Sequence, residues 1–142
     1  MKRIRFSLLA VGGILISSCA YSVHAQQGGW SASVSGPSFQ YRGMQASSPA
    51  LLPAASLQVS ADNVVTVIYW RYQLASAAPI DLTVKLCALN RCVNLDSASG
   101  QTSGLQGIPA NSEFRMMFYV PGTGRISASV DVVSSEISVN YR

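Results

Sequence analysis

The 142-residue sequence is poor in the side chains on which most enzymes and metal sites depend. It contains one histidine, His24, three cysteines and only 11% charged residues. Because the histidine lies near the start, the rest of the chain cannot form a Ser-His-Asp triad, a Cys-His pair or a histidine-based metal site. A glycosidase-like pair of carboxylates is the enzymatic alternative that the sequence leaves open. We expect no catalytic residues, no cofactor and no metal site.

A short apolar run, Phe6 to Ile16, follows three basic residues among the first five positions. The run is too short to cross a bilayer as a helix, and this layout is typical of a secretory signal peptide. A small-residue cleavage signal ends at Ala25, so we expect cleavage between Ala25 and Gln26. Residues 1–25 would then be a signal peptide, and residues 26–142 a single domain in the periplasm.

Lipidation is the alternative use of this leader. Ile16-Ser17-Ser18-Cys19 resembles a lipobox, in which the cysteine carries an acyl anchor that holds the protein on a membrane. The cleavage signal at Ala25 favours release without an anchor. Membrane anchoring is therefore expected only if Cys19 is lipidated.

Positive charge is concentrated in the leader. The chain has 10 Lys and Arg against 6 Asp and Glu, and three of the basic residues leave with residues 1–25, so the remainder carries 7 − 6 = +1. Nucleic-acid binding needs basic side chains clustered on one face. We therefore expect no nucleic-acid partner.

The two cysteines after the leader, Cys87 and Cys92, are spaced for a hairpin. A two-residue turn at Leu89-Asn90 places them opposite each other on the polar face, where close Cα atoms suit a cross-strand disulfide. An exported chain meets an oxidising compartment, which favours this bond. The alternative, a redox-active pair, usually needs two intervening residues at a helix start. The sequence therefore predicts one structural disulfide.

Alternating apolar and polar residues with turn signals between them predict strands along most of the chain. No segment after the leader shows a sustained helical period. We expect an all-β fold, a single antiparallel β-sandwich of about seven or eight strands. The expected strands are 39–42, 57–61, 64–72, 80–87, 92–96, 114–120, 126–133 and 137–141, and the rest of 26–56 is expected to be irregular.

The same alternation predicts which side chains form the core. The expected core consists of Leu57, Val59, Ile68, Trp70, Tyr72, Leu82, Val84, Leu86, Val93, Leu95, Phe114, Met116, Phe118, Val120, Ile126, Ala128, Val130, Val132, Ile137, Val139 and Tyr141.

Several apolar and aromatic residues fall on the outward side of the expected strands. Val65, Val67 and Tyr69 lie on the outward side of 64–72. Met117 and Tyr119 lie on that side of 114–120, and Val133 lies on that side of 126–133. Either the N-terminal segment covers them, or they form a surface for a partner or a second copy of the chain. Several arginines lie beside aromatic residues or at the start of a strand. Such arginines either contact a partner protein at an interface or form ion pairs with Asp and Glu of the same chain. The candidate partner-binding residues are Arg42, Tyr69, Arg71, Met117, Tyr119, Arg125 and Arg142.

A series of short motifs recurs in one order along the chain. They are Gly29-Trp30, Tyr41-Arg42-Gly43, Trp70-Arg71-Tyr72, Leu86-Cys87 with Arg91-Cys92-Val93, Leu95-Asp96 with Ser99-Gly100, Val120-Pro121-Gly122 with Gly124-Arg125, and the ending Val139-Asn140-Tyr141-Arg142. In this order, from about Trp30 to Arg142, the chain resembles the FlhE family of flagellar proteins. Cys19 departs from that family, whose members are taken to be soluble in the periplasm.

The resemblance implies a non-enzymatic periplasmic accessory of flagellar export. It implies binding to flagellar export or axial proteins. It also implies a chaperone or gatekeeper action, which prevents premature flagellar assembly in the periplasm, limits proton leak through the export gate, or both. A homodimer is compatible with the outward apolar residues. The alternative is a β-sandwich that binds carbohydrate or peptidoglycan, with Trp30, Trp70 and tyrosines stacked on sugar rings.

Overall fold

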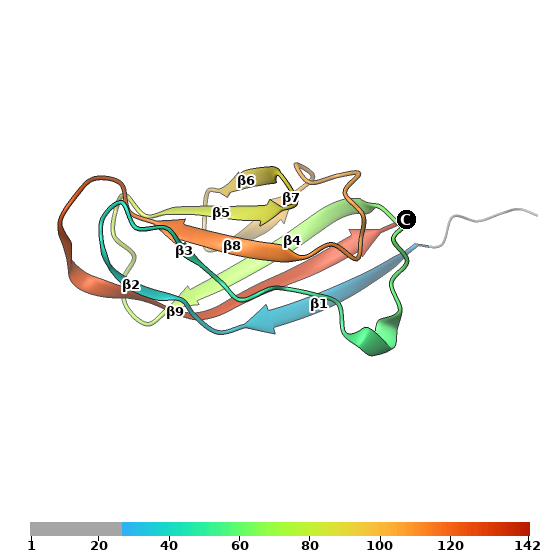
Figure 1. Ribbon diagram of the computed structural model, residues 1–142, viewed down its shortest axis with the longest axis horizontal. Helices are drawn as coiled ribbons and strands as arrows, with labels where there is room; N and C mark the ends of the chain where they lie inside the picture. Colours follow the sequence, from blue (N-terminus) through green and yellow to red (C-terminus); the bar gives the residue numbers. More distant parts are fainter. Residues whose placement is uncertain (1–26) are drawn as a thin grey trace, which may run out of the picture.

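The computed structural model describes residues 27–142, which form two antiparallel β-sheets stacked face to face (Figure 1). The predicted all-β sandwich is confirmed, with nine strands in these residues. Within the same residues, no helix has the length and apolar character needed to cross a membrane. The expected signal peptide, the site between Ala25 and Gln26, and Cys19 lie outside the described residues.

The larger sheet has the strand order β1-β9-β4-β7, with β2 paired to the first part of β9. Its strands are β1 (Gly28–Val34), β2 (Ser38–Tyr41), β4 (Val65–Leu74), β7 (Ser99–Thr102) and β9 (Arg125–Tyr141). The smaller sheet has the order β3-β8-β5-β6. Its strands are β3 (Ala46–Ser47), β5 (Thr83–Ala88), β6 (Arg91–Leu95) and β8 (Phe114–Tyr119). A short 3-10 helix, η1 (Ala55–Leu57), lies between β3 and β4.

A β-bulge at Thr66 decides which side chains of β4 face the core. Val65 is opposite Tyr141 and Val67 is opposite Asn140, so β4 has one residue more than β9 at this point. The extra residue shifts the alternation, and both Val65 and Ile68 are buried. The prediction that Val65 faces outward is therefore wrong, whereas Tyr69 is exposed as expected.

Residues 125–141 form one continuous strand where the sequence predicts two, 126–133 and 137–141. Leu74 is opposite Val132 and Gln73 is opposite Ser134, which leaves Val133 as a bulge in β9. Buried side chains fall on even positions before the bulge and on odd positions after it. The apparent break between two strands is therefore a change of phase within a single strand.

Three strands that the sequence did not predict, β1, β3 and β7, lie at the borders of the two sheets. β1 and β7 are rich in Gly and Ser, which have low strand propensity, yet both pair there. The N-terminal segment thus extends the sheet through β1 and leaves the outer face of β4 uncovered at Tyr69. The expected strand 57–61 is absent, because Leu57 ends η1 and its side chain is 53% exposed.

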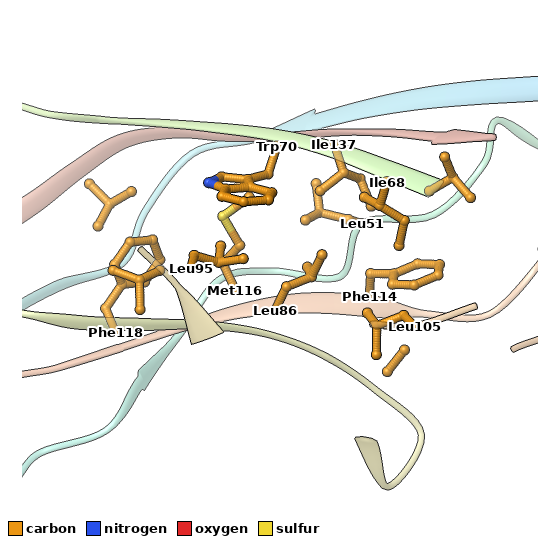
Figure 2. Close-up of a cluster of buried hydrophobic side chains, with 14 of the residues drawn as sticks. Leu51, Ile68, Trp70, Leu86, Leu95, Leu105, Phe114, Met116, Phe118 and Ile137 are labelled. Atoms are coloured by element: carbon orange, nitrogen blue, oxygen red, sulfur yellow. The ribbon is translucent and has the colours of Figure 1, made fainter. Parts of the chain in front are cut away.

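The core lies between the two sheets (Figure 2). Ile68 and Trp70 enter it from the larger sheet, and Leu86, Met116 and Phe118 enter it from the smaller one. Most of the predicted core is buried or packed against it, but Leu57 and Ala128 are exposed. Buried residues that alternation did not identify are Trp30, Phe39, Leu51, Val65, Ala88, Leu105, Ile108 and Ala110.

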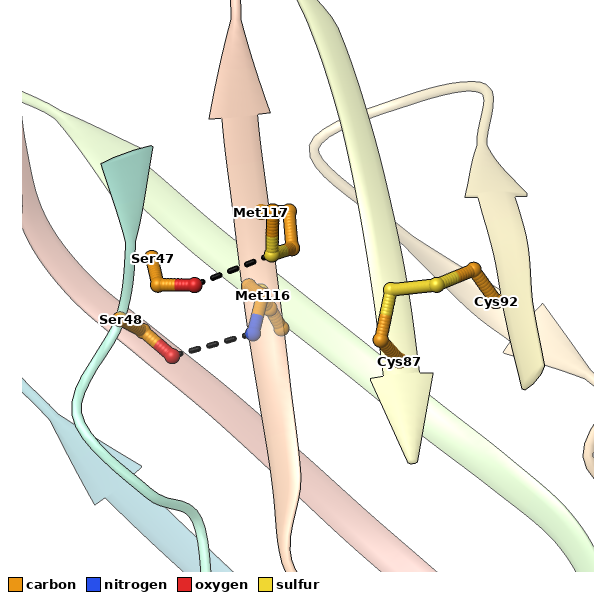
Figure 3. The surroundings of a disulfide bond; sticks show 6 residues. All are labelled: Ser47, Ser48, Cys87, Cys92, Met116 and Met117. Carbon is orange, nitrogen blue, oxygen red and sulfur yellow. Dashed lines mark hydrogen bonds between the residues drawn. A yellow bond between two sulfur atoms is a disulfide. The ribbon is translucent and has the colours of Figure 1, made fainter. Parts of the chain in front are cut away.

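The hairpin of β5 and β6 has the predicted register. Cys87 is opposite Cys92, their Cα atoms are 4.1 Å apart, and the two residues form a disulfide (Figure 3). Leu86 is opposite Val93, as expected for the apolar side of the hairpin. The disulfide therefore lies on the outer side of the smaller sheet, away from the core.

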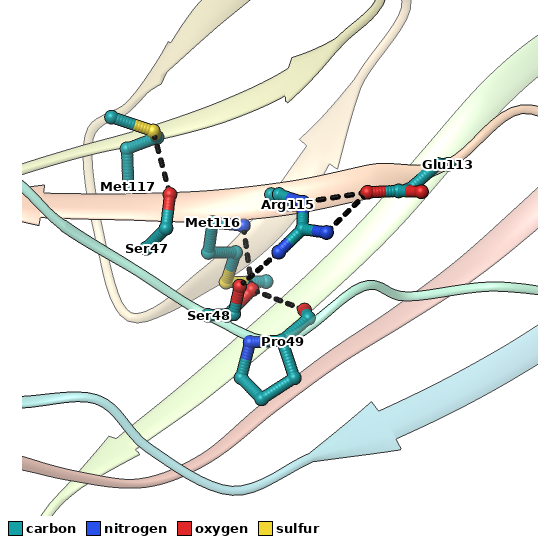
Figure 4. Close-up of polar contacts among 7 residues, drawn as sticks. All are labelled: Ser47, Ser48, Pro49, Glu113, Arg115, Met116 and Met117. Carbon is teal, nitrogen blue, oxygen red and sulfur yellow. Dashed lines mark hydrogen bonds and ion pairs between the residues drawn. The ribbon is translucent and has the colours of Figure 1, made fainter.

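The chain after β3 is held on β8 by Ser48, which is almost fully buried. Its Oγ accepts a hydrogen bond from the Met116 N–H at 3.0 Å and donates one to the Pro49 carbonyl at 2.8 Å (Figure 4). Arg115 donates to the Ser48 carbonyl and also forms an ion pair with Glu113. These bonds fix the border of the smaller sheet opposite β1.

Candidate functional site

The outer face of the larger sheet brings together residues from β1, β9 and β4. One row across the sheet contains Ser31, Ser138 and Tyr69, and the next contains Ser33, Glu136 and Arg71. Because neighbouring residues of a row are opposite each other, their side chains stand side by side on the same face. We call these six residues the Tyr69 face.

Tyr69 and Arg71 project from β4 because the alternation after the Thr66 bulge points them away from the buried Ile68 and Trp70. Tyr69 is 47% exposed. The Arg71 guanidinium forms an ion pair with the Glu136 carboxylate, with Nη2 and Oε2 2.6 Å apart, and its Nε donates to the same oxygen at 2.7 Å. This pair sets the direction of the Arg71 side chain beside the Tyr69 ring.

Shallow hollows lie on both sides of Tyr69 and Arg71. The first, of about 440 Å³, lies over β1 and β9 and includes Ser31, Ser33 and Ser138 in its lining. The second, of about 520 Å³, lies toward β7 and includes Ser99 and Gln101. Tyr69 and Arg71, the large side chains of β4, thus form a ridge between the two hollows, both of which have serines in their linings.

This arrangement suits non-covalent binding. A half-exposed tyrosine offers an apolar ring with a polar tip, and a guanidinium keeps donors for carbonyl or carboxylate oxygens. Aromatic and arginine side chains with few competing charges nearby are typical of protein interfaces. Among residues 27–142 there is no group of three or more His, Cys, Asp and Glu side chains placed to hold a metal ion.

The serines of the Tyr69 face are residues that sequence reasoning missed. Serine alternates with apolar residues at these positions, since Ser31 and Ser33 flank Ala32, and Ser138 follows Ile137. A serine at every second position indicates an exposed strand face without large side chains. That pattern could have identified the hollow, had β1 been recognised as a strand.

Met117 and Tyr119 lie on the outer face of the smaller sheet and are half-buried. The Ser47 hydroxyl donates to the Met117 sulfur at 3.0 Å, and the Lys85 ammonium lies 5.7 Å from the centroid of the Tyr119 ring. Neighbouring strands thus partly cover both side chains, which belong to a different face from Tyr69.

Arg42 and Arg125 lie near one end of the sandwich, at the turn between β8 and β9. Arg42 forms an ion pair with Asp81 at 2.6 Å and donates to the Pro121 carbonyl. The hydrogen bond from Arg42 holds the pKa of the Asp81 carboxyl below its ordinary value. Arg125 donates to the Gln40 side chain at 2.8 Å. Both arginines therefore have intramolecular partners.

Arg142 lies at the far end of β9. Its backbone N–H donates to the Val64 carbonyl, and its carbonyl accepts from the Val64 N–H. The seven candidate partner-binding residues therefore fall into four places, and only Tyr69 and Arg71 stand together on an open face.

Both tryptophans are buried, which bears on the carbohydrate alternative. Trp30 is 4% exposed and donates from Nε1 to the Ala110 carbonyl at 2.8 Å, and Trp70 is 6% exposed and donates to the Ser97 carbonyl at 3.0 Å. Neither ring can stack on a sugar. That expectation is wrong for both tryptophans, which are core residues.

Comparison with known proteins gives consistent results. The sequence model of the family described as flagellar protein FlhE matches residues 36–142. A flagellar protein FlhE of Salmonella typhimurium is 40% identical over 118 residues, which is 83% of this chain and 88% of that protein. The protein of the same name from Yersinia enterocolitica is 33% identical over 141 residues, 99% of this chain and 96% of the relative.

A solved structure also matches. The crystal structure titled "Crystal Structure of FLHE" is 39% identical to this chain, with a TM-score of 0.77, and the match covers 83% of this chain and 99% of the other. Sequence and fold thus agree over the β-sandwich with the resemblance indicated by the ordered motifs. The chain belongs to the flagellar protein FlhE family.

Proposed function

We propose that the chain is a periplasmic accessory protein of the flagellum that binds flagellar export or axial proteins. It acts as a chaperone or gatekeeper that prevents premature flagellar assembly in the periplasm, limits proton leak through the export gate, or both. Membership of the FlhE family supports the flagellar role, and the leader pattern in residues 1–25 supports the compartment. The proposed action is binding, without a catalytic step.

The observation that carries the proposal is the exposure of Tyr69 beside the Arg71–Glu136 ion pair. The three side chains stand on a sheet face that no other described segment covers, between two hollows lined by small residues. Because Arg71 and Glu136 neutralise each other, the face attracts neither strongly acidic nor strongly basic partners. An uncharged or mixed-charge polypeptide surface suits it best.

Deletion of the gene in the flagellated bacterium that carries it tests the role, and complementation tests the site. We expect the deletion strain to show filaments in the periplasm or altered motility, and the wild-type chain to correct this. The Tyr69→Ser variant is expected to accumulate normally but fail to correct it. Tyr41→Ser is the matched control, since Tyr41 is 53% exposed and lies opposite Arg125 at the start of β9, away from the Tyr69 face.

A normal deletion strain, with no ectopic filaments and ordinary swimming, would overturn the proposed role. Full correction by Tyr69→Ser would overturn the proposed site. Sedimentation of the purified protein with peptidoglycan tests the carbohydrate alternative. We expect no co-sedimentation, and pelleting that depends on Tyr69 would contradict the proposal of a protein partner.

A further inference from the structure

β1 is an open border of the larger sheet. On one side it pairs with β9 over its whole length, from Gly28 opposite Tyr141 to Val34 opposite Ser135. Among residues 27–142 no strand pairs with its other side, and Figure 1 shows β1 at the lower border of the sheet. Such a border presents unpaired backbone N–H and C=O groups at alternate residues, which a further strand can satisfy.

The other border strands in the described part of the chain are short or covered. β3 has two residues, and β2 and β7 have four each. On β6, Arg91 donates hydrogen bonds to the carbonyls of Gly104 and Gln106. Gly104 approaches Val93 so closely that a Cβ would clash with it, and the loop after β7 therefore packs against β6. Short strands and loop cover both discourage edge pairing.

β1 is longer than these strands and lacks the sequence features that discourage edge pairing. It has seven residues and contains no charge, no proline and no bulge. Ala32 and Val34 lie on its inner side and remain half-buried at the border of the core. A strand added beside β1 would therefore complete backbone hydrogen bonds and also bury apolar surface.

The sequence of β1 is complementary to itself in an antiparallel register centred on Ser31. On the inner side, the half-buried Ala32 and Val34 of one strand are then opposite Trp30 and Gly28 of the other. Trp30 is buried in its own core and Gly28 has no side chain, so neither obstructs the pairing. On the outer side, Ser31 is opposite its own copy. Because β1 has no charged residue, no like charges oppose each other across the twofold axis.

We propose that β1 pairs with β1 of a second copy of this chain, in the register centred on Ser31. The two larger sheets then join into one continuous sheet, and the twofold axis places both Tyr69 faces on the same side. The interface is formed by one strand from each copy and is smaller than a standard protein interface. The dimer is therefore weak and forms at high protein concentration, and this inference does not depend on the flagellar role.

Sedimentation equilibrium of the purified protein from about 1 µM to about 1 mM tests the pairing. We expect reversible dimerisation of the wild-type protein. Ser31→Lys and Ser31→Glu each place two like charges opposite each other and should weaken association at least about tenfold. An equal mixture of the two variants should restore the dimer, because lysine then faces glutamate. Gln101→Lys is the control, since it adds the same charge to the border strand β7 on the same outer face.

Cross-linking gives a second measurement that does not depend on charge. Ser31→Cys should form a disulfide-linked dimer under oxidising conditions, and Gln101→Cys should not. Wild-type protein that stays monomeric throughout the concentration range would overturn the proposal. A dimer unaffected by Ser31→Lys, or weakened equally by Gln101→Lys, would overturn it too, because either result assigns the contact to another surface.

Discussion

Arg71 on β4 and Glu136 on β9 are directly opposite each other, and their charged groups meet at 2.6 Å on the outer face of the larger sheet. Their side chains are 61% and 34% exposed, so water screens the attraction. Exposed ion pairs of this kind contribute about 0–1 kcal/mol to stability. The pair therefore matters more for the orientation of Arg71 beside Tyr69 than for the fold.

Replacement of Arg71 should leave the stability of the protein almost unchanged. For Arg71→Gln we expect the free energy of unfolding to change by less than about 1 kcal/mol, since only a screened ion pair is lost. Urea denaturation measures this change. A loss above about 2 kcal/mol would show that the pair supports the fold, and Arg71 variants could then not report on binding.

Ser135 is fully buried after the Val133 bulge, and its hydroxyl has no hydrogen-bond partner among the described residues. Removal of an unpaired buried hydroxyl should stabilise the protein, by about 1 kcal/mol for Ser135→Ala. Thermal and urea denaturation measure the effect. Ser127→Ala, at an exposed position of the same strand, is the control and should change stability by less than about 0.5 kcal/mol. Destabilisation by Ser135→Ala would contradict the absence of a partner.

The Cys87–Cys92 disulfide closes a short loop on the outer side of the hairpin. In the chain-entropy model such a short loop contributes about 2 kcal/mol or less. We expect the double variant Cys87→Ser, Cys92→Ser to keep the fold and lose no more than this amount in urea denaturation. Amide hydrogen exchange should show faster opening only in β5 and β6. Global unfolding of the variant would show that the disulfide holds more than the hairpin.

The hairpin was also the part of the fold that could be predicted in most detail, because its turn and its alternation depend only on neighbouring residues. The bulges at Thr66 and Val133 could not be predicted in the same way. A bulge depends on the partner strand, so the sequence of β4 or β9 alone cannot show that the phase changes. β1 was missed because its Gly and Ser residues become a strand only through pairing with β9.

The candidate site was predicted only in part for the same reason. Tyr69 and Arg71 could be identified because alternation within β4 points both outward. Their association with Ser31 and Ser138 comes from strands separated widely along the chain. The burial of Trp30 likewise depends on tertiary packing, since its ring reaches the Ala110 carbonyl far along the chain.

The Asp81 carboxylate gives a pH-dependent prediction. The hydrogen bond from Arg42 lowers the pKa of Asp81 in the folded state, so this bond stabilises the protein above the ordinary carboxyl pKa of about 3.9. The stabilisation is lost as the pH falls through the lower folded-state pKa. We expect Asp81→Asn to be less stable than wild type at pH 7 and equally stable near pH 2.

The Arg42→Gln variant completes this test. If the Asp81 effect arises from Arg42, the double variant should be no less stable at pH 7 than Arg42→Gln alone, which also loses the bond to the Pro121 carbonyl. Urea denaturation of all four proteins at both pH values provides the data. Additive losses would contradict the assignment, because they would show that the two residues act through different partners.

Photo-crosslinking in living cells is the most direct test of whether the Tyr69 face binds a flagellar protein. A photoreactive phenylalanine analogue placed at position 69 lies on this face. Position 41, where the same analogue serves as control, is on another part of the surface and has a similar exposure, 53% against 47%. We predict that position 69 crosslinks to a flagellar export or axial protein and that position 41 does not. No adduct from position 69, or the same adducts from both positions, would contradict the account.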